Sequence, residues 1–128
     1  MIRTLVILLG LMAVSAAPSA QELPLRNQDY IRDAVQLADV LGSAHGVRYV
    51  CNGKDDQYWR VHMITLLRLE APDSGALRSS LVRAFNNAFS NAQQRYPICD
   101  TRAVDAEAQY AEEGRDLSDR LAAYYLPR

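Results

Sequence analysis

Residues 28–44, QDYIRDAVQLADVLGSA, predict a helix with one continuous apolar face, and the rest of the fold can be built outward from it. The apolar side chains of this stretch stand three or four positions apart, which places them on one side of a helix. They are Ile31, Ala34, Val35, Ala38 and Leu41. Asn27 is a suitable N-cap, because its side chain can accept a hydrogen bond from a free backbone amide. Gly42 and Gly46, with His45 between them, mark the region where we expect this helix to end.

Three further stretches, at residues 55–71, 75–95 and 101–124, show the same helical spacing of apolar side chains. Pro72 and Pro97 stop the second and third helices, and Asp100 is a suitable N-cap for the fourth. Val47–Cys51 is rich in β-formers, but it is too short to suggest a sheet. The sequence therefore predicts an all-α antiparallel bundle of about four helices with short connections.

The first 20 residues have the layout of a secretory signal peptide. A positive start at Arg3 is followed by the apolar run Leu5–Val14 and by a tail of small residues that reaches Ala20. The apolar run is shorter than the roughly 20 residues that a membrane-spanning helix needs. We therefore expect cleavage after Ala16 or Ala20, and a periplasmic protein with a single helical domain over residues 21–128.

The two cysteines, Cys51 and Cys99, are expected to form one disulfide, because export takes the chain into an oxidising compartment. In the predicted fold each cysteine stands between two helices, so the bond would join two interhelical connections. A redox-active pair is the alternative, but such pairs are usually close in sequence. A zinc site with His45 and His62 is another, but the spacing matches no local ligand pair. We expect no metal.

Charge and motif content exclude several classes of function. Without the first 20 residues the chain has 13 basic and 15 acidic side chains, a net charge of −2, which argues against non-specific nucleic-acid binding. No catalytic residue is predicted, because the sequence has no G-x-S-x-G elbow and Ser79 and Ser80 are far in sequence from both histidines. We expect no cofactor, and we favour a protein that is not an enzyme.

A longer pattern, LGxxHxxRxxCxGxxDQxWRxxM followed by FN and YPxC, runs through the chain. It comprises Leu41, Gly42, His45, Arg48, Cys51, Gly53, Asp56, Gln57, Trp59, Arg60, Met63, Phe85, Asn86, Tyr96, Pro97 and Cys99. With this pattern the chain resembles a small secreted alphaproteobacterial family of unknown function. Val47 departs from an expected leucine, and Ala88-Phe89 from an expected glycine-tyrosine, but both changes keep apolar character. The resemblance implies export, two cysteines and a helical domain, and it implies no activity.

Six polar and aromatic residues near the predicted disulfide form a candidate binding surface: His45, Arg48, Asp56, Gln57, Trp59 and Arg60. The arginines could hold a carboxylate or phosphate, and Trp59 could offer an aromatic platform. Structural roles are the alternative, and we favour them. Asp56 and Gln57 could cap the second helix, and Asp56 could pair with Arg60. Trp59 could belong to the core, and His45 could cap the end of the first helix.

The function expected from these observations is that of a non-catalytic interaction or accessory protein of the cell envelope. Its partner would be an unidentified envelope protein, and no stable membrane insertion is expected after signal cleavage. One alternative is a small periplasmic chaperone or stress protein. Another is an envelope enzyme or ligand binder that uses the His45–Arg60 surface. The aromatic C-terminal tail, residues 124–128, could dock on a partner or pack on its own bundle.

Overall fold

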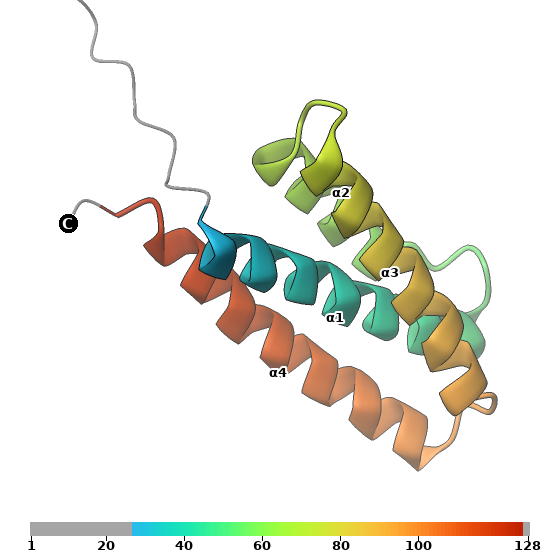
Figure 1. The fold of residues 1–128 in the computed structure, drawn as a ribbon. Helices are drawn as coiled ribbons and strands as arrows, with labels where there is room; N and C mark the ends of the chain where they lie inside the picture. Colours follow the sequence, from blue (N-terminus) through green and yellow to red (C-terminus); the bar gives the residue numbers. More distant parts are fainter. Residues whose placement is uncertain (1–26, 127–128) are drawn as a thin grey trace, which may run out of the picture.

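A computed structural model describes residues 27–126 and contains four helices (Figure 1). They are α1 (Gln28–Asn52), α2 (Tyr58–Glu70), α3 (Ala76–Arg95) and α4 (Thr101–Ala123). Successive helices run in opposite directions, and no strand occurs between residues 27 and 126. The predicted all-α antiparallel bundle is confirmed. The predicted signal peptide, residues 1–20, and its cleavage point lie outside the described residues.

Helix α1 is the central element of the bundle. It packs most extensively against α3, then against α4 and α2. Helix α2 touches α3 only slightly, and no Cα atom of α2 lies within 8 Å of a Cα atom of α4. Because the outer helices pack on α1 and hardly on each other, the bundle leaves open space between α2 and α4.

The prediction that α1 ends near Gly42 and Gly46 is wrong. Both glycines lie within the helix. A Cβ atom added at Gly42 would lie 2.2 Å from the carbonyl oxygen of Phe85, and one added at Gly46 would lie 2.5 Å from the carbonyl oxygen of Phe89. They are therefore the positions where the backbone of α3 comes closest to α1. The β-rich stretch from Val47 forms the last turns of α1, because Val47 is fully buried in a second core cluster and tertiary packing overrides local preference.

Helix starts agree with the sequence where a side chain caps them. Asn27 Oδ1 accepts a hydrogen bond from the Tyr30 amide at 2.9 Å, and Asp100 Oδ1 accepts one from the Ala103 amide at 3.0 Å. Both predicted N-caps are confirmed. Helix α2 begins at Tyr58, later than the predicted residue 55, and Asp56 stays in the connection, where its Oδ1 accepts a hydrogen bond from the Tyr58 amide at 3.1 Å.

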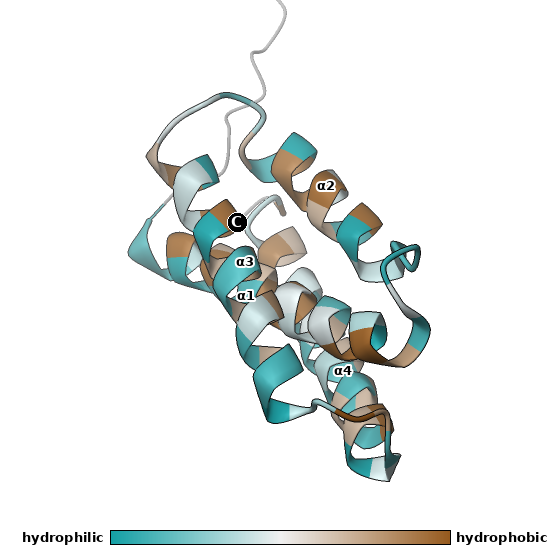
Figure 2. Cartoon of the chain, turned by 90° about the vertical axis from the view of Figure 1, so that its right-hand side faces the viewer, coloured by the Kyte–Doolittle hydropathy of each residue, from teal (hydrophilic) through white to brown (hydrophobic). Residues whose placement is uncertain are grey.

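The main core lies where α1 faces its three neighbours. Its largest fully buried side chains are Tyr30, Leu81 and Leu117, one from each of α1, α3 and α4. Helix α2 contributes Met63 and Leu66. Apolar positions, drawn in brown, recur along α2 (Figure 2), and several of them are not covered by the core. This helix therefore leaves apolar surface accessible.

The predicted disulfide between Cys51 and Cys99 is confirmed, with an S–S distance of 2.05 Å. Cys51 lies in the last turn of α1, and Cys99 lies in the connection between α3 and α4, so the bond ties the end of a helix to a loop. Neither sulfur is available as a zinc ligand. Between residues 27 and 126, no three His, Cys, Asp or Glu side chains are grouped so as to hold a metal ion. No helix in this range has the length and apolarity needed to cross a bilayer.

Candidate functional site

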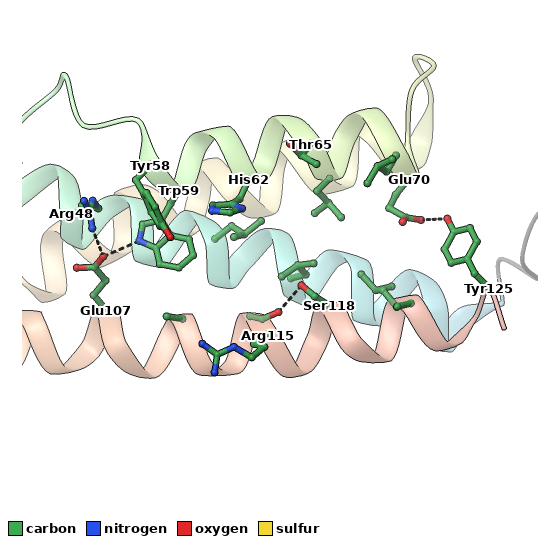
Figure 3. A pocket seen from close by; sticks show the side chains of 18 residues that line it. Arg48, Tyr58, Trp59, His62, Thr65, Glu70, Glu107, Arg115, Ser118 and Tyr125 are labelled. Carbon is green, nitrogen blue, oxygen red and sulfur yellow. Dashed lines mark hydrogen bonds and ion pairs between the residues drawn. The ribbon is translucent and has the colours of Figure 1, made fainter.

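An open groove of about 820 Å³ runs between α2 and α4, with α1 as its floor (Figure 3). Residues from three helices line it: Leu37, Leu41 and Arg48 of α1, Tyr58, Trp59, His62, Thr65, Leu66, Leu69 and Glu70 of α2, and Glu107, Ala111, Gly114, Arg115, Ser118, Leu121 and Ala122 of α4, with Tyr125 just after it. The groove is the space that α2 and α4 leave open because each packs on α1.

A polar cluster closes one end of the groove. Glu107 Oε1 accepts hydrogen bonds from Arg48 Nη1 at 3.1 Å and from Trp59 Nε1 at 3.0 Å. Arg48 Nε donates to Asp56 Oδ2 at 2.7 Å, and its guanidinium lies 4.7 Å from the centre of the Tyr58 ring. We call Arg48, Asp56, Trp59 and Glu107 the Arg48 cluster. This cluster links the floor of the groove to both of its walls, and it holds the start of α2 to α1 and α4.

The ionised forms of the Arg48 cluster are stabilised by these contacts. The hydrogen bond to Glu107 raises the pKa of Arg48 above its ordinary value, against the effect of burial, with help from Asp56. Burial disfavours the carboxylate of Asp56, but hydrogen bonds from Asn52, the Tyr58 amide and Arg48 outweigh it and lower the pKa of Asp56. The cluster is therefore a set of charges paired with one another.

Two tyrosines and a buried carboxylate close the other end. Glu70 accepts hydrogen bonds from the hydroxyls of Tyr30 and Tyr125, the latter at 2.7 Å. The ring of Tyr124 packs edge-on against Tyr30, with ring centroids 5.5 Å apart. The C-terminal tail thus packs on its own bundle as far as Tyr125. Residues 127 and 128 lie outside the described part of the chain.

Between its two polar ends the groove is mainly apolar. Leu37 and Leu41 of α1 form the floor together with Leu66 and Leu121, and all four are buried. The α2 wall includes the side chains of Tyr58 and Leu69, which are 52% and 62% exposed. Small residues of α4, Ala111, Gly114, Ser118 and Ala122, leave room along the other wall. The groove offers apolar surface that a ligand can cover.

The structure divides the predicted binding surface. Arg48, Asp56 and Trp59 meet in the Arg48 cluster. Gln57 is exposed and donates to the Lys54 carbonyl oxygen at 3.0 Å, a local contact of the connection. Arg60 is exposed and forms no ion pair with any residue from 27 to 126, because Asp56 pairs with Arg48 instead.

His45 stands apart from this surface. It is 5% exposed, and its imidazole stacks on Phe85 and Phe89 of α3, with ring centroids 5.7 Å and 4.9 Å away. It is not the cap at the end of α1 that the sequence suggested. Its Nδ1 has no hydrogen-bond partner among residues 27–126. Burial lowers the pKa of His45, the charge of Arg60 lowers it further, and Asp56 partly offsets both.

Sequence reasoning missed the α4 wall of the groove, and Glu107 above all. Glu107 is 48 residues from Trp59 and 59 from Arg48, so no local pattern links them. One signal was present. From Glu107 to Ala122, one face of α4 carries small residues at helical spacing, which is unusual for a helix that packs on its neighbours through large side chains.

Several of the polar side chains around the groove are bound to one another or to their own helices. The charged groups of the Arg48 cluster are paired with one another. The hydroxyls of Thr65 and Ser118 donate to backbone oxygens of their own helices, Val61 and Gly114. No serine or threonine between residues 27 and 126 is hydrogen-bonded to a histidine, which is the arrangement that would activate a nucleophile.

Comparison with known proteins places the chain in a family. No curated protein and no solved structure matches it. The family described as "Protein of unknown function (DUF2385)" matches residues 29–125, a range that covers all of the four helices except the first residue of α1 and includes both cysteines. This agrees with the resemblance to a family of unknown function seen in the sequence. The chain belongs to the DUF2385 family of proteins of unknown function.

Proposed function

We propose that this protein is an exported, non-catalytic binding protein of the cell envelope, and that the groove between α2 and α4 is its binding site. The predicted leader at residues 1–20 and the disulfide support a periplasmic location, since disulfides persist in oxidising compartments. The alphaproteobacterial origin and the secreted character of the family stay predictions.

The open groove is the observation that carries this proposal. Ligand sites in proteins typically enclose about 300–1,000 Å³ and combine apolar walls with a few fixed polar groups. The groove measures about 820 Å³, has four buried leucines around its floor and is closed by the Arg48 cluster at one end. An accessory role in the envelope follows if an envelope component is the molecule held there.

A matched pair of variants tests the proposal. Ala122 lines the groove and is exposed, so Ala122→Phe fills the groove without displacing core side chains. Ala123 is its exposed neighbour outside the groove, and Ala123→Phe is the control. Wild type and both variants are crosslinked in the periplasm, purified, and examined by mass spectrometry for proteins and small molecules.

We expect wild type and Ala123→Phe to retain the same molecule and Ala122→Phe to lose it. If Ala122→Phe retains that molecule as well as its control does, the groove is not the binding site. A protein among the retained molecules would identify the envelope partner that the sequence led us to expect.

A second candidate, a small chaperone that acts under acid stress, is favoured by His45. A buried imidazole with a lowered pKa resists protonation, so acid should destabilise the fold and expose apolar surface. Binding of a hydrophobic dye and protection of an aggregating client, both measured as the pH falls, test this candidate. A fold that stays intact and gives no protection at acidic pH counts against it.

A further inference from the structure

The groove is long in relation to its volume. Its α4 wall runs from Glu107 to Tyr125, about 27 Å at 1.5 Å per residue. About 820 Å³ over this length gives a mean cross-section of about 30 Å². A helix about 10 Å across fills about 80 Å², so it could not lie wholly inside the groove. The groove therefore suits an extended, slender chain.

The apolar part of the groove has a defined length and a closed end. From Arg115 to Tyr125 the α4 wall extends about 15 Å, and Leu66, Leu69 and Leu121 lie along this part. The hydrogen bond between Tyr125 and Glu70 closes it (Figure 3). An alkyl chain that enters beside Arg115 would be covered by leucines up to this end.

A cationic side chain, that of Arg115, stands at the start of the apolar part. Arg115 of α4 and His62 of α2 both line the groove in its middle (Figure 3). Arg48 also lines it, but its guanidinium is already bound to Asp56 and Glu107. Arg115 forms no ion pair with another residue in the range 27–126. Its charge is therefore complementary to an anionic group on a ligand.

Resting on the function proposed above, we propose that the groove binds a free single-chain anionic amphiphile, a long-chain carboxylate. Its head group lies at Arg115, at the rim of the groove, and its alkyl chain lies over Leu66, Leu69 and Leu121. The slender cross-section selects a single alkyl chain, and the charge of Arg115 selects the carboxylate.

Trp59 provides the measurement, because it lines the groove and is the single tryptophan of the chain. Its fluorescence is titrated with decanoate and dodecanoate below their micelle concentrations, and with neutral dodecanol and cationic dodecyltrimethylammonium. We expect dodecanoate to bind about tenfold more tightly than decanoate, because two further methylenes are buried. We expect dodecanol to bind about fivefold more weakly than dodecanoate.

Two pairs of variants locate the ligand. Arg115→Gln should weaken dodecanoate binding about fivefold and remove the preference over dodecanol. Arg83→Gln, an exposed arginine of α3 outside the groove, should change neither. Ala122→Phe should block binding and Ala123→Phe should not. Far-UV circular dichroism establishes that every variant is folded.

The outcomes separate this inference from the proposed function. If dodecanol and dodecyltrimethylammonium bind as tightly as dodecanoate, the anionic class is wrong, and the groove remains a binding site if Ala122→Phe weakens all three. If Ala122→Phe binds dodecanoate as tightly as Ala123→Phe, or if no probe binds, the inference is overturned. The proposed function is then decided by the molecule that wild type retains from the periplasm.

Discussion

Replacing Gly42 by alanine should destabilise the protein, although alanine is the better helix former. The added Cβ would lie 2.2 Å from the Phe85 carbonyl oxygen and 2.9 Å from its Cα, and Cβ contacts under 3.0 Å are essentially never seen. Both atoms belong to the backbone of α3, so no side chain can rotate away. Helices α1 and α3 would have to separate by close to 1 Å along the largest interface of the bundle.

The magnitude follows from two opposing terms. Alanine in place of glycine favours a helix interior by about 1 kcal/mol. Overpacking a rigid interface costs about 1–3 kcal/mol, and the upper end applies here because neither of the two backbone atoms can move aside on its own. We expect a net loss of about 2 kcal/mol in the free energy of unfolding, which lowers Tm by about 10 °C in a domain of this size. Chemical and thermal denaturation followed by far-UV circular dichroism measure both quantities.

Gly114→Ala is the matched control. There the added Cβ would meet Val40 Cγ1 at 3.6 Å and Leu37 Cδ1 at 3.8 Å, which are ordinary contacts with side chains. The higher helix propensity of alanine should therefore dominate, and the free energy of unfolding of this variant should rise by about 1 kcal/mol. If Gly42→Ala is as stable as wild type, or gains stability as Gly114→Ala does, the close approach of α1 and α3 at Gly42 is refuted.

Three further predictions concern His45, the disulfide and Trp59. Because the fold favours the neutral form of His45, its contribution to stability is complete above the unfolded pKa of about 6.5 and is lost as the pH falls below that value. His45→Phe should therefore flatten the stability–pH curve below about pH 6.5, and an unchanged slope would exclude His45 as the cause of the loss. Replacing Cys51 and Cys99 by serine should cost about 4 kcal/mol, because the bond closes a loop of 48 residues; a loss under 1 kcal/mol in urea denaturation would contradict this. Trp59→Phe removes the hydrogen-bond donor to Glu107 and should cost about 1 kcal/mol in the same assay. Adding Glu107→Gln to this variant should cost less than Glu107→Gln costs in the wild-type protein, whereas equal costs would show that the two residues are not coupled.

The parts of the fold that depend on neighbouring residues could be predicted from the sequence. Asn27 and Asp100 cap the helices that follow them through bonds to amides three residues away. Helical spacing of apolar residues identified all four helices. The bounds of α3 and α4 differ from the predicted ones by a single residue at most. These features need no knowledge of the tertiary structure.

The length of α1 could not be predicted in this way. Glycine often follows the last turn of a helix, and Gly42 and Gly46 were interpreted as such a signal. In the structure their missing side chains serve the contact with Phe85 and Phe89 of α3, more than 40 residues away in sequence. A glycine that ends a helix and one that allows two helices to approach look the same in a single sequence.

The candidate site was predicted in part for the same reason. Residues close in sequence to the disulfide, such as Arg48 and Trp59, were recognised as a polar and aromatic group, and they do meet. Their shared partner Glu107 comes from α4 and could be found only from the fold. His45 is close to Arg48 in sequence, but it lies on the side of α1 that faces α3, so it is separated from the groove.

The groove follows from the way α1 is used. In a regular four-helix bundle each helix packs on two neighbours around a shared core. Here the glycines of α1 allow α3 to pack directly on it, so α1 contacts all three other helices and its residues 40–47 are all buried. Helices α2 and α4 then each pack on α1 and do not contact each other through their backbones. Side-chain hydrogen bonds bridge the gap at Glu107 and at Tyr125, and the apolar space between these two bridges is the groove.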